Sequence, residues 1–265
     1  MMKVALVTGG NRGIGKEIVR KLALDGYRVI LTSRLVCNSF DFFSRAKLFD
    51  LGLSNIDVHP LDLRCKESIS GLRETVEMQY GRLDVLVQNA AVSGGGNVKR
   101  DFVGDMLKTN FWGPSCLMKE FYELLGDCSR VVFMSSMVSM RILTNARHPL
   151  VYEIGQNNTH LTERRLEELA ETYTNNYESD KNLPRSCYGV SKILINGLAR
   201  VYAEKARKDG KNMLVNSCCP GFVKTDMNKG NPNAKKLPVE GAKLPFYLAT
   251  LPESCRLTGA YLSDA

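Results

Sequence analysis

Short apolar runs alternate along this chain with longer segments in which apolar residues recur at helical spacing. The runs predict buried strands at Lys3–Thr8, Arg28–Thr32, Ile56–Leu61, Leu83–Gln88, Arg130–Met134, Met213–Ser217 and Gly259–Ser263. Helical patterns reach Leu24 and Tyr80, cover Asp101–Leu125, and begin again at Tyr188. Strands that alternate with helices predict an α/β fold with a parallel sheet of about seven strands, right-handed crossovers and helices on both faces.

Residues able to bind a ligand follow these predicted strands. They are Gly9, Arg34, Asp62, Asn89, Ser136 and Pro220. Ligands of parallel α/β sheets bind beyond the carboxyl ends of the strands. The chain therefore predicts one site at that edge.

The first strand leads into Gly9-Gly10-Asn11-Arg12-Gly13-Ile14-Gly15 and then into a helix. Glycines at 9, 13 and 15 let backbone amides approach a diphosphate at the positive end of the helix. A glycine loop alone is weak evidence, but its place after the first strand of a βαβ unit predicts a dinucleotide site.

The second strand ends in Ser33-Arg34, where an NAD-binding protein typically has an acid. An acid would repel a 2′-phosphate, whereas Arg34 and Arg12 can bind it through charge-assisted hydrogen bonds. We therefore expect NADP(H), although two exposed arginines without this role would give the same pattern.

Tyr188 and Lys192 are four residues apart, so one helix face carries both. A nearby cation stabilises a phenolate and lowers a tyrosine pKa from its usual value of about 10. The pair predicts a proton-exchanging tyrosine, but an aromatic residue and a lysine one turn apart are also common at a helix start.

Two asparagines leave alternatives open. Asn89 either approaches the cofactor or ties neighbouring strands together. Asn110, inside a predicted helix, either holds a kink or a water or is a neutral surface residue.

Taken together, the motifs resemble the short-chain dehydrogenase/reductase family over nearly the whole chain. The elements that carry the resemblance are TGGNRGIG from Thr8, Asp62, QNAA from Gln88, Asn110, Ser136, YGVSK from Tyr188 and PGFVKT from Pro220. The long run between Ser136 and Tyr188, the YGVSK variant and CCPGFVKTDM most resemble the NADPH-dependent carbonyl reductases of that family. The resemblance implies a doubly wound sheet of the Rossmann type.

The resemblance also implies the site. Its catalytic residues would be Asn110, Ser136, Tyr188 and Lys192. Its cofactor-binding residues would be Gly9, Asn11, Arg12, Gly13, Ile14, Gly15, Arg34, Asp62, Leu63, Asn89, Ala90, Tyr188, Lys192, Pro220, Gly221, Val223 and Thr225. Asp62 would accept a hydrogen bond from the adenine amino group.

Two positions depart from the family pattern or leave it ambiguous. Ala91 stands where the common NNAG motif has glycine, so the cofactor needs room for a methyl group. In the Ser135-Ser136 doublet the catalytic role falls to Ser136 by the family pattern, and alternation along a strand would then point Ser135 away.

The expected reaction is NADPH-dependent reduction of a ketone, aldehyde or quinone, with hydride from the nicotinamide and a proton from Tyr188. The alternatives are an NADP-dependent alcohol or steroid dehydrogenase of the same family, which runs the reaction in reverse, and a regulator that binds NADPH without catalysis.

Composition narrows the setting. The 265 residues include 44% hydrophobic and 24% charged residues, and no apolar run reaches the roughly 18 residues of a membrane span. The first predicted strand begins at Lys3, which leaves no room for a signal segment, so we expect a cytoplasmic protein. The net charge of +8 is dispersed, so a small-molecule carbonyl partner is expected and nucleic acid is not. Eight cysteines without a CxxC pair, and only three histidines, do not indicate a metal site.

We expect one domain over residues 1–265 with a helical insertion at about 141–184. Thr162 can cap a helix there, and Leu166, Leu169, Ala170, Tyr173 and Tyr177 form an apolar stripe along it. In similar family members the helix that begins at the catalytic tyrosine pairs with a second subunit. If the stripe covers that helix, the protein is a monomer; the alternative is that the stripe itself is a dimer contact.

The pocket walls are expected from Met137–Leu143 and from the segment after Gly221, where Phe222, Met227 and Gly230–Pro238 resemble a mobile lid over an apolar substrate. Cys187 and Cys219 either react with electrophiles or simply pack.

Overall fold

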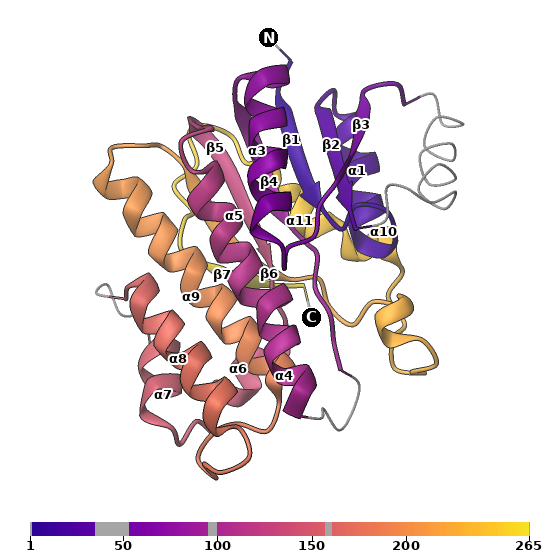
Figure 1. The fold of residues 1–265 in the computed structure, drawn as a ribbon. Coiled ribbons are helices and arrows are strands. Elements are labelled where there is room, and N and C mark those ends of the chain that lie inside the picture. The colour runs from indigo at the N-terminus through magenta and orange to yellow at the C-terminus, as the bar shows by residue number, and fades with distance from the viewer. Residues whose placement is uncertain (1, 35–52, 95–99, 157–160, 265) are drawn as a thin grey trace.

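The computed structural model describes residues 2–34, 53–94, 100–156 and 161–264, and these form a seven-stranded parallel sheet (Figure 1). Its strands are β1 (Val4–Thr8), β2 (Arg28–Ser33), β3 (Ile56–Pro60), β4 (Leu83–Gln88), β5 (Leu125–Met134), β6 (Leu214–Cys219) and β7 (Tyr261–Ser263). They lie in the order β3-β2-β1-β4-β5-β6-β7. The chain first adds β2 and β3 on one side of β1 and then continues with β4 on the other side of β1. The strand order therefore reverses between β1 and β4, and sheets of this kind bind ligands at such a switch point.

Helices cover both faces of this sheet (Figure 1). On one face lie α3 (Lys66–Tyr80), α4 (Arg100–Leu107), α5 (Gly113–Phe121) and α9 (Cys187–Lys208), and on the other lie α1 (Gly13–Leu24), α10 (Pro238–Gly241) and α11 (Lys243–Ala249). Alternate residues of β1 enter separate cores, since Leu6 packs with the α9 side and Ala5 and Val7 with the α1 side. Burial on both faces explains why the strands are apolar throughout.

One predicted element differs in extent. The helix expected over Asp101–Leu125 is interrupted by a π-helical turn, η1 (Lys108–Trp112), and α5 ends at Phe121. The segment from Leu125 belongs to β5 instead, because Leu125 pairs with Leu83. The register then shifts before Arg130 pairs with Val85, and this irregularity hid the start of the strand from the apolar pattern.

Helix α6 (Met137–Leu143) begins before the insertion predicted at about 141–184, and that segment contains α7 (Pro149–Gly155) and α8 (Glu163–Asn176). The capping prediction is confirmed, because the Arg165 backbone N–H donates to Thr162 Oγ1 at 3.4 Å. The stripe residues Leu166, Leu169, Ala170 and Tyr173 are buried.

The insertion lies against the outer side of α9 (Figure 1). At Gly197, in the middle of α9, an added Cβ would lie 2.5 Å from Leu166 Cδ2 and 3.3 Å from Ile154 Cγ2. Any larger residue would have to displace the Leu166 side chain, so glycine at this position favours the close approach of α8.

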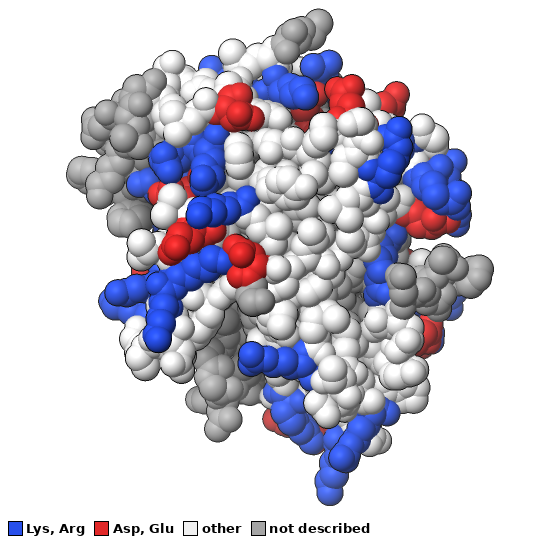
Figure 2. Space-filling model, turned by 180° about the vertical axis from the view of Figure 1, so that it is seen from behind, with Lys and Arg blue, Asp and Glu red and all other residues white. Residues whose placement is uncertain are grey.

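Surface charge is dispersed on the face in Figure 2, where Lys and Arg side chains lie around the edge of a broad uncharged area and acidic side chains lie among them. Within the described ranges, no helix combines the length and apolar character needed to span a bilayer.

Candidate active site

The glycine loop between β1 and α1 is shaped by close backbone contacts. Gly9 and Gly13 have positive φ values of 65° and 54°. A Cβ on Gly15 would lie only 2.3 Å from the Gly9 carbonyl oxygen and 2.5 Å from Asn89 Nδ2. The first amides of α1 receive no side-chain cap from Arg12. The loop therefore leaves a bare helix N-terminus of the kind that binds a diphosphate.

Asn89 links β4 to β1, which is the second of the two roles predicted for it. Its Nδ2 donates to the Thr8 and Gly9 carbonyl oxygens at 2.9 and 3.1 Å. Thr8 Oγ1 accepts from the Asn89 and Ala90 backbone N–H groups, both at 3.0 Å. Asn89 and Thr8 thus hold the glycine loop against the end of β4, and the sequence reasoning missed the part of Thr8.

The predicted phosphate-binding arginines lie at the surface, Arg34 directly after β2 and Arg12 in the glycine loop after β1. Arg34 is exposed, and Arg12 forms an ion pair with Asp226 at 3.0 Å. Both side chains of that pair are more than 60% exposed, so solvent screens it and leaves Arg12 available to a phosphate.

The Asp62 carboxylate after β3 already has a partner. It accepts from the Arg64 guanidinium at 2.9 and 3.1 Å and from the Arg64 backbone N–H at 3.0 Å. These bonds lower the pKa of Asp62, with a smaller contribution from Arg34. The sequence did not predict that Arg64 would pair with Asp62. The only signal for this pair in the sequence is a basic residue two positions after an aspartate.

Ser136, Tyr188 and Lys192 meet at the carboxyl end of β5. Ser136 caps α6, with its Oγ accepting from the Val138 backbone N–H at 3.3 Å. Lys192 is 3% exposed, donates to the Met134 carbonyl oxygen at 2.7 Å, and places Nζ 5.4 Å from the centroid of the Tyr188 ring.

Neighbouring Ser135 points elsewhere, as expected. Its hydroxyl donates to the Lys192 carbonyl oxygen at 3.4 Å, so it serves the backbone of α9. Ser136, in contrast, interacts with the Tyr188 side chain and lowers its pKa.

The pKa of Tyr188 is contrary in direction to the prediction. Burial and, to a smaller extent, Cys219 raise it to about 12, and the interaction with Ser136 opposes them. Burial also lowers the pKa of Lys192 to about 8. The spacing of Tyr188 and Lys192 predicted a lowered pKa from the nearby cation, but desolvation of the phenolate is the larger effect here.

Asn110 lies in the π-helical turn and is 1% exposed, so it is not a neutral surface residue. Its side chain accepts from the Val92 N–H and donates to the Val92 carbonyl oxygen, both at 2.9 Å. It also donates to Ser191 Oγ at 3.1 Å, and Ser191 donates to the Tyr188 carbonyl oxygen at 2.7 Å. The π-turn thereby connects Asn110 to the first turn of α9; such turns occur frequently at functional sites. Ser191, three residues after Tyr188, was missed.

The segment after Pro220 returns over the glycine loop. A Cβ on Gly13 would lie 3.4 Å from Thr225 Cγ2, which places Thr225 beside the loop. The segment includes a short 3-10 helix, η2 (Asp226–Asn228), and its base is closed where the Lys224 N–H donates to the Lys236 carbonyl oxygen at 2.8 Å. Phe222 and Met227 are 44% and 43% exposed, which suits the apolar lid predicted there.

Three comparisons show which known proteins this chain resembles. A family model described as short chain dehydrogenase matches residues 3–147, more than half of the chain. The chain belongs to the short-chain dehydrogenase family. The predicted family and its Rossmann-type sheet are confirmed, and the protein is an oxidoreductase.

Individual relatives in this family align over nearly the full length. Carbonyl reductase (NADPH) 1 of Mus musculus is 38% identical over 94% of this chain and 91% of its own. The (+)-neomenthol dehydrogenase of Arabidopsis thaliana is 35% identical over 98% of this chain and 96% of its own. Among solved structures, salutaridine reductase from Papaver somniferum superposes with a TM-score of 0.87 at 26% identity, covering 99% of this chain and 100% of that one.

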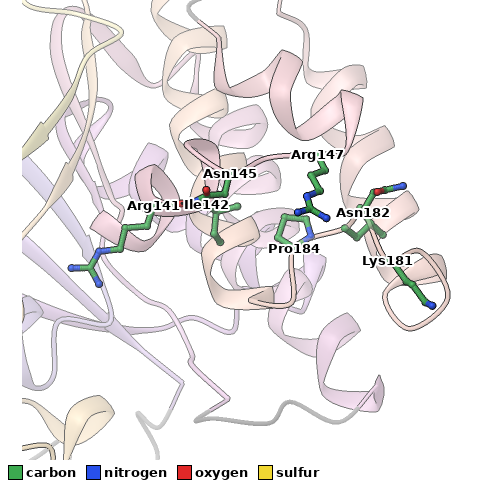
Figure 3. A pocket seen from close by; sticks show the side chains of 8 residues that line it. Arg141, Ile142, Asn145, Arg147, Lys181, Asn182 and Pro184 are labelled. Carbon is green, nitrogen blue, oxygen red and sulfur yellow. Dashed lines mark hydrogen bonds between the residues drawn. The ribbon is translucent and has the colours of Figure 1, made fainter.

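One cavity of this dehydrogenase lies beside the site. It has a volume of about 310 Å³ and is bordered by the end of α6 and the loop before α9. Figure 3 shows Arg147 over Pro184, with Arg141 and Lys181 extending away on opposite sides. The cavity does not include Ser136, Tyr188 or Lys192, so we assign it no part in the chemistry.

The cysteines flanking the site favour the packing interpretation. Cys187 and Cys219 are 1% and 4% exposed, and burial raises the pKa of Cys187 to about 12. A buried, protonated thiol is a poor nucleophile.

Proposed function

We propose that this dehydrogenase-family protein reduces the carbonyl group of an apolar ketone, aldehyde or quinone with NADPH. The observation that carries the proposal is the cluster of half-buried Ser136 and Tyr188 with buried Lys192 at the end of β5, beside a glycine loop shaped for a diphosphate. The expectation of NADPH as cofactor is supported by the carbonyl reductases that align over nearly the whole chain.

The residues present fit that cofactor. Gly9 and Gly15 leave the space that a Cβ would fill, and the uncapped N-terminus of α1 faces it. Arg12 and Arg34 would supply positive charge for the 2′-phosphate. Pro220, Gly221, Val223 and Thr225, on the segment that approaches the glycine loop at Gly13, would hold the nicotinamide end. When bound, NADPH supplies the hydride that adds to the carbonyl carbon.

Tyr188 supplies the proton. With a pKa of about 12 it holds its proton at neutral pH, and the alkoxide formed from a carbonyl by hydride addition is a stronger base than a phenolate. The O–H bond of Tyr188 breaks as the alcohol O–H bond forms, so carbonyl, hydride and proton give an alcohol. A high pKa favours this direction over alcohol oxidation, which needs the phenolate as base.

Ser136 donates a hydrogen bond to the carbonyl oxygen as negative charge develops on it. Lys192 remains mostly protonated at neutral pH, binds the nicotinamide ribose and stabilises the phenolate left after proton transfer. Asn110 holds the helix that carries Tyr188 and retains a water for proton return. Its contacts with Val92 and Ser191 support the first of these roles.

The second candidate is a dehydrogenase for secondary alcohols, favoured by the 35% identity to the (+)-neomenthol dehydrogenase. It uses the same residues in reverse.

The test follows NADPH absorbance with matched ketones, aldehydes and quinones, and NADP+ with the corresponding alcohols. Carbonyl-dependent NADPH oxidation at neutral pH, faster than alcohol oxidation, is expected. Faster alcohol oxidation would favour the second candidate, and NADPH binding without turnover in either direction would leave a non-catalytic regulator.

A further inference from the structure

Ser136 depends on α6 for its position. Its carbonyl oxygen accepts from Ser139 Oγ at 2.6 Å and from the Ser139 backbone N–H at 3.0 Å. Its own hydroxyl accepts from Val138. The serine that faces Tyr188 is therefore fixed by the first turn of a seven-residue helix.

That turn is itself bonded to α9. Asn196 Nδ2 donates to Ser139 Oγ at 3.1 Å, and the two residues are 9% and 0% exposed. Asn196 follows Tyr188 by eight residues and Lys192 by four, so all three lie along one side of α9. The remaining contacts between α6 and α9 near this point are apolar, such as Ile142 against Gly189.

Stability alone does not explain an asparagine at this place. Its neighbours Ile195 and Leu198 are buried and apolar, and Asn196 Oδ1 is buried without a hydrogen bond from any described residue. An unsatisfied buried carbonyl is costly, and a leucine of similar size would avoid that cost. What leucine cannot supply is the N–H that orients Ser139.

We propose that Asn196 is a positioning residue that holds Ser136 at the correct distance from Tyr188 through the hydroxyl of Ser139. The inference rests on the proposed function, because it assigns Ser136 and Tyr188 their catalytic parts. Helix α9 then positions all three groups around the reacting carbonyl. It carries Tyr188 and Lys192 directly, and it places Ser136 through this two-bond link.

The test compares Asn196→Leu, Ser139→Ala and the double variant. Each single change should lower kcat roughly 10- to 100-fold, the scale of a small misplacement of a catalytic group, with the KM for NADPH unchanged. The double variant should lose no more than the worse single variant, because both changes cut the same link. Ser139→Ala removes only one oxygen, so it decides the matter if Asn196→Leu does not fold.

Asn216→Leu is the matched control. Asn216 is also buried and bonds the Leu257 carbonyl oxygen at 2.8 Å and the Ala260 N–H at 3.0 Å, away from Ser136. It should lower the melting temperature without changing kcat per folded molecule. Normal kcat in both single variants, or losses that multiply in the double variant, would overturn the inference. If wild-type enzyme itself turns over no carbonyl, the proposed function fails instead.

Discussion

The glycine loop and helix α9 border the same site but contribute to it in opposite ways. The loop contributes through the absence of side chains. Even one more carbon atom at Gly15 would collide with the Gly9 carbonyl oxygen. Helix α9 provides functional groups, with Tyr188 and Lys192 on its inner side and the insertion against its outer side. A change in the loop should therefore act through sterics on cofactor binding, whereas a change on the inner side of α9 should act on the chemical step.

Gly15→Ala tests the steric role of the glycine loop in cofactor binding. The new methyl group would lie 2.3 Å from the Gly9 carbonyl oxygen and 2.5 Å from Asn89 Nδ2. We expect a loss of about 1–3 kcal/mol in the free energy of unfolding from overpacking, together with a marked loss of NADPH affinity. Thermal unfolding and fluorescence titration with NADPH measure the two effects.

Gly71→Ala provides the matched control. Gly71 lies inside α3, where an added Cβ meets nothing within 4 Å. It should leave NADPH affinity unchanged and stabilise the protein by roughly 0.5–1 kcal/mol. Equal NADPH affinity in both variants would show that the loop does not contact the cofactor.

At Arg34, on the surface near the glycine loop, we expect charge and not steric fit to determine cofactor binding. Arg34→Asp should reverse or erase the preference for NADPH over NADH, because each charged hydrogen bond to a phosphate contributes about 1.5–3 kcal/mol. The ratio of kcat/KM values for the two cofactors is the measurement. If this ratio is the same in variant and wild type, the phosphate is bound elsewhere.

The outer side of α9 gives the smallest expected effect. We expect the molecular mass in solution not to change with protein concentration. Because α7 and α8 cover this side, we propose that the protein is a monomer. Sedimentation equilibrium at micromolar concentration should give a mass near 29.5 kDa. A stable dimer or tetramer would mean that the insertion does not prevent association.

The sequence predicted the parallel sheet because a sheet of this kind depends on local pattern. Apolar runs mark strands buried on both faces, and polar residues follow their carboxyl ends. What it did not predict depends on contacts between distant segments. The link from Asn196 to Ser136 and the irregular start of β5 leave no periodic signal.

The Tyr188 pKa illustrates the same limit in energetic terms. The spacing of Tyr188 and Lys192 was visible in the sequence, but the degree of burial that raises the pKa is a property of the packed site. Burial also changes the interpretation of the pair, from a tyrosine that ionises easily to one that holds its proton until the carbonyl accepts the hydride.

The central claim is that Tyr188 is the proton donor, and Tyr188→Phe tests it most directly. The variant keeps the ring beside Lys192 and removes only the hydroxyl. NADPH should bind with nearly wild-type affinity, measured by fluorescence titration, while kcat for carbonyl reduction falls by at least ~100-fold, the contribution of a positioned general acid. Near-normal turnover by this variant, with NADPH bound, would contradict the account.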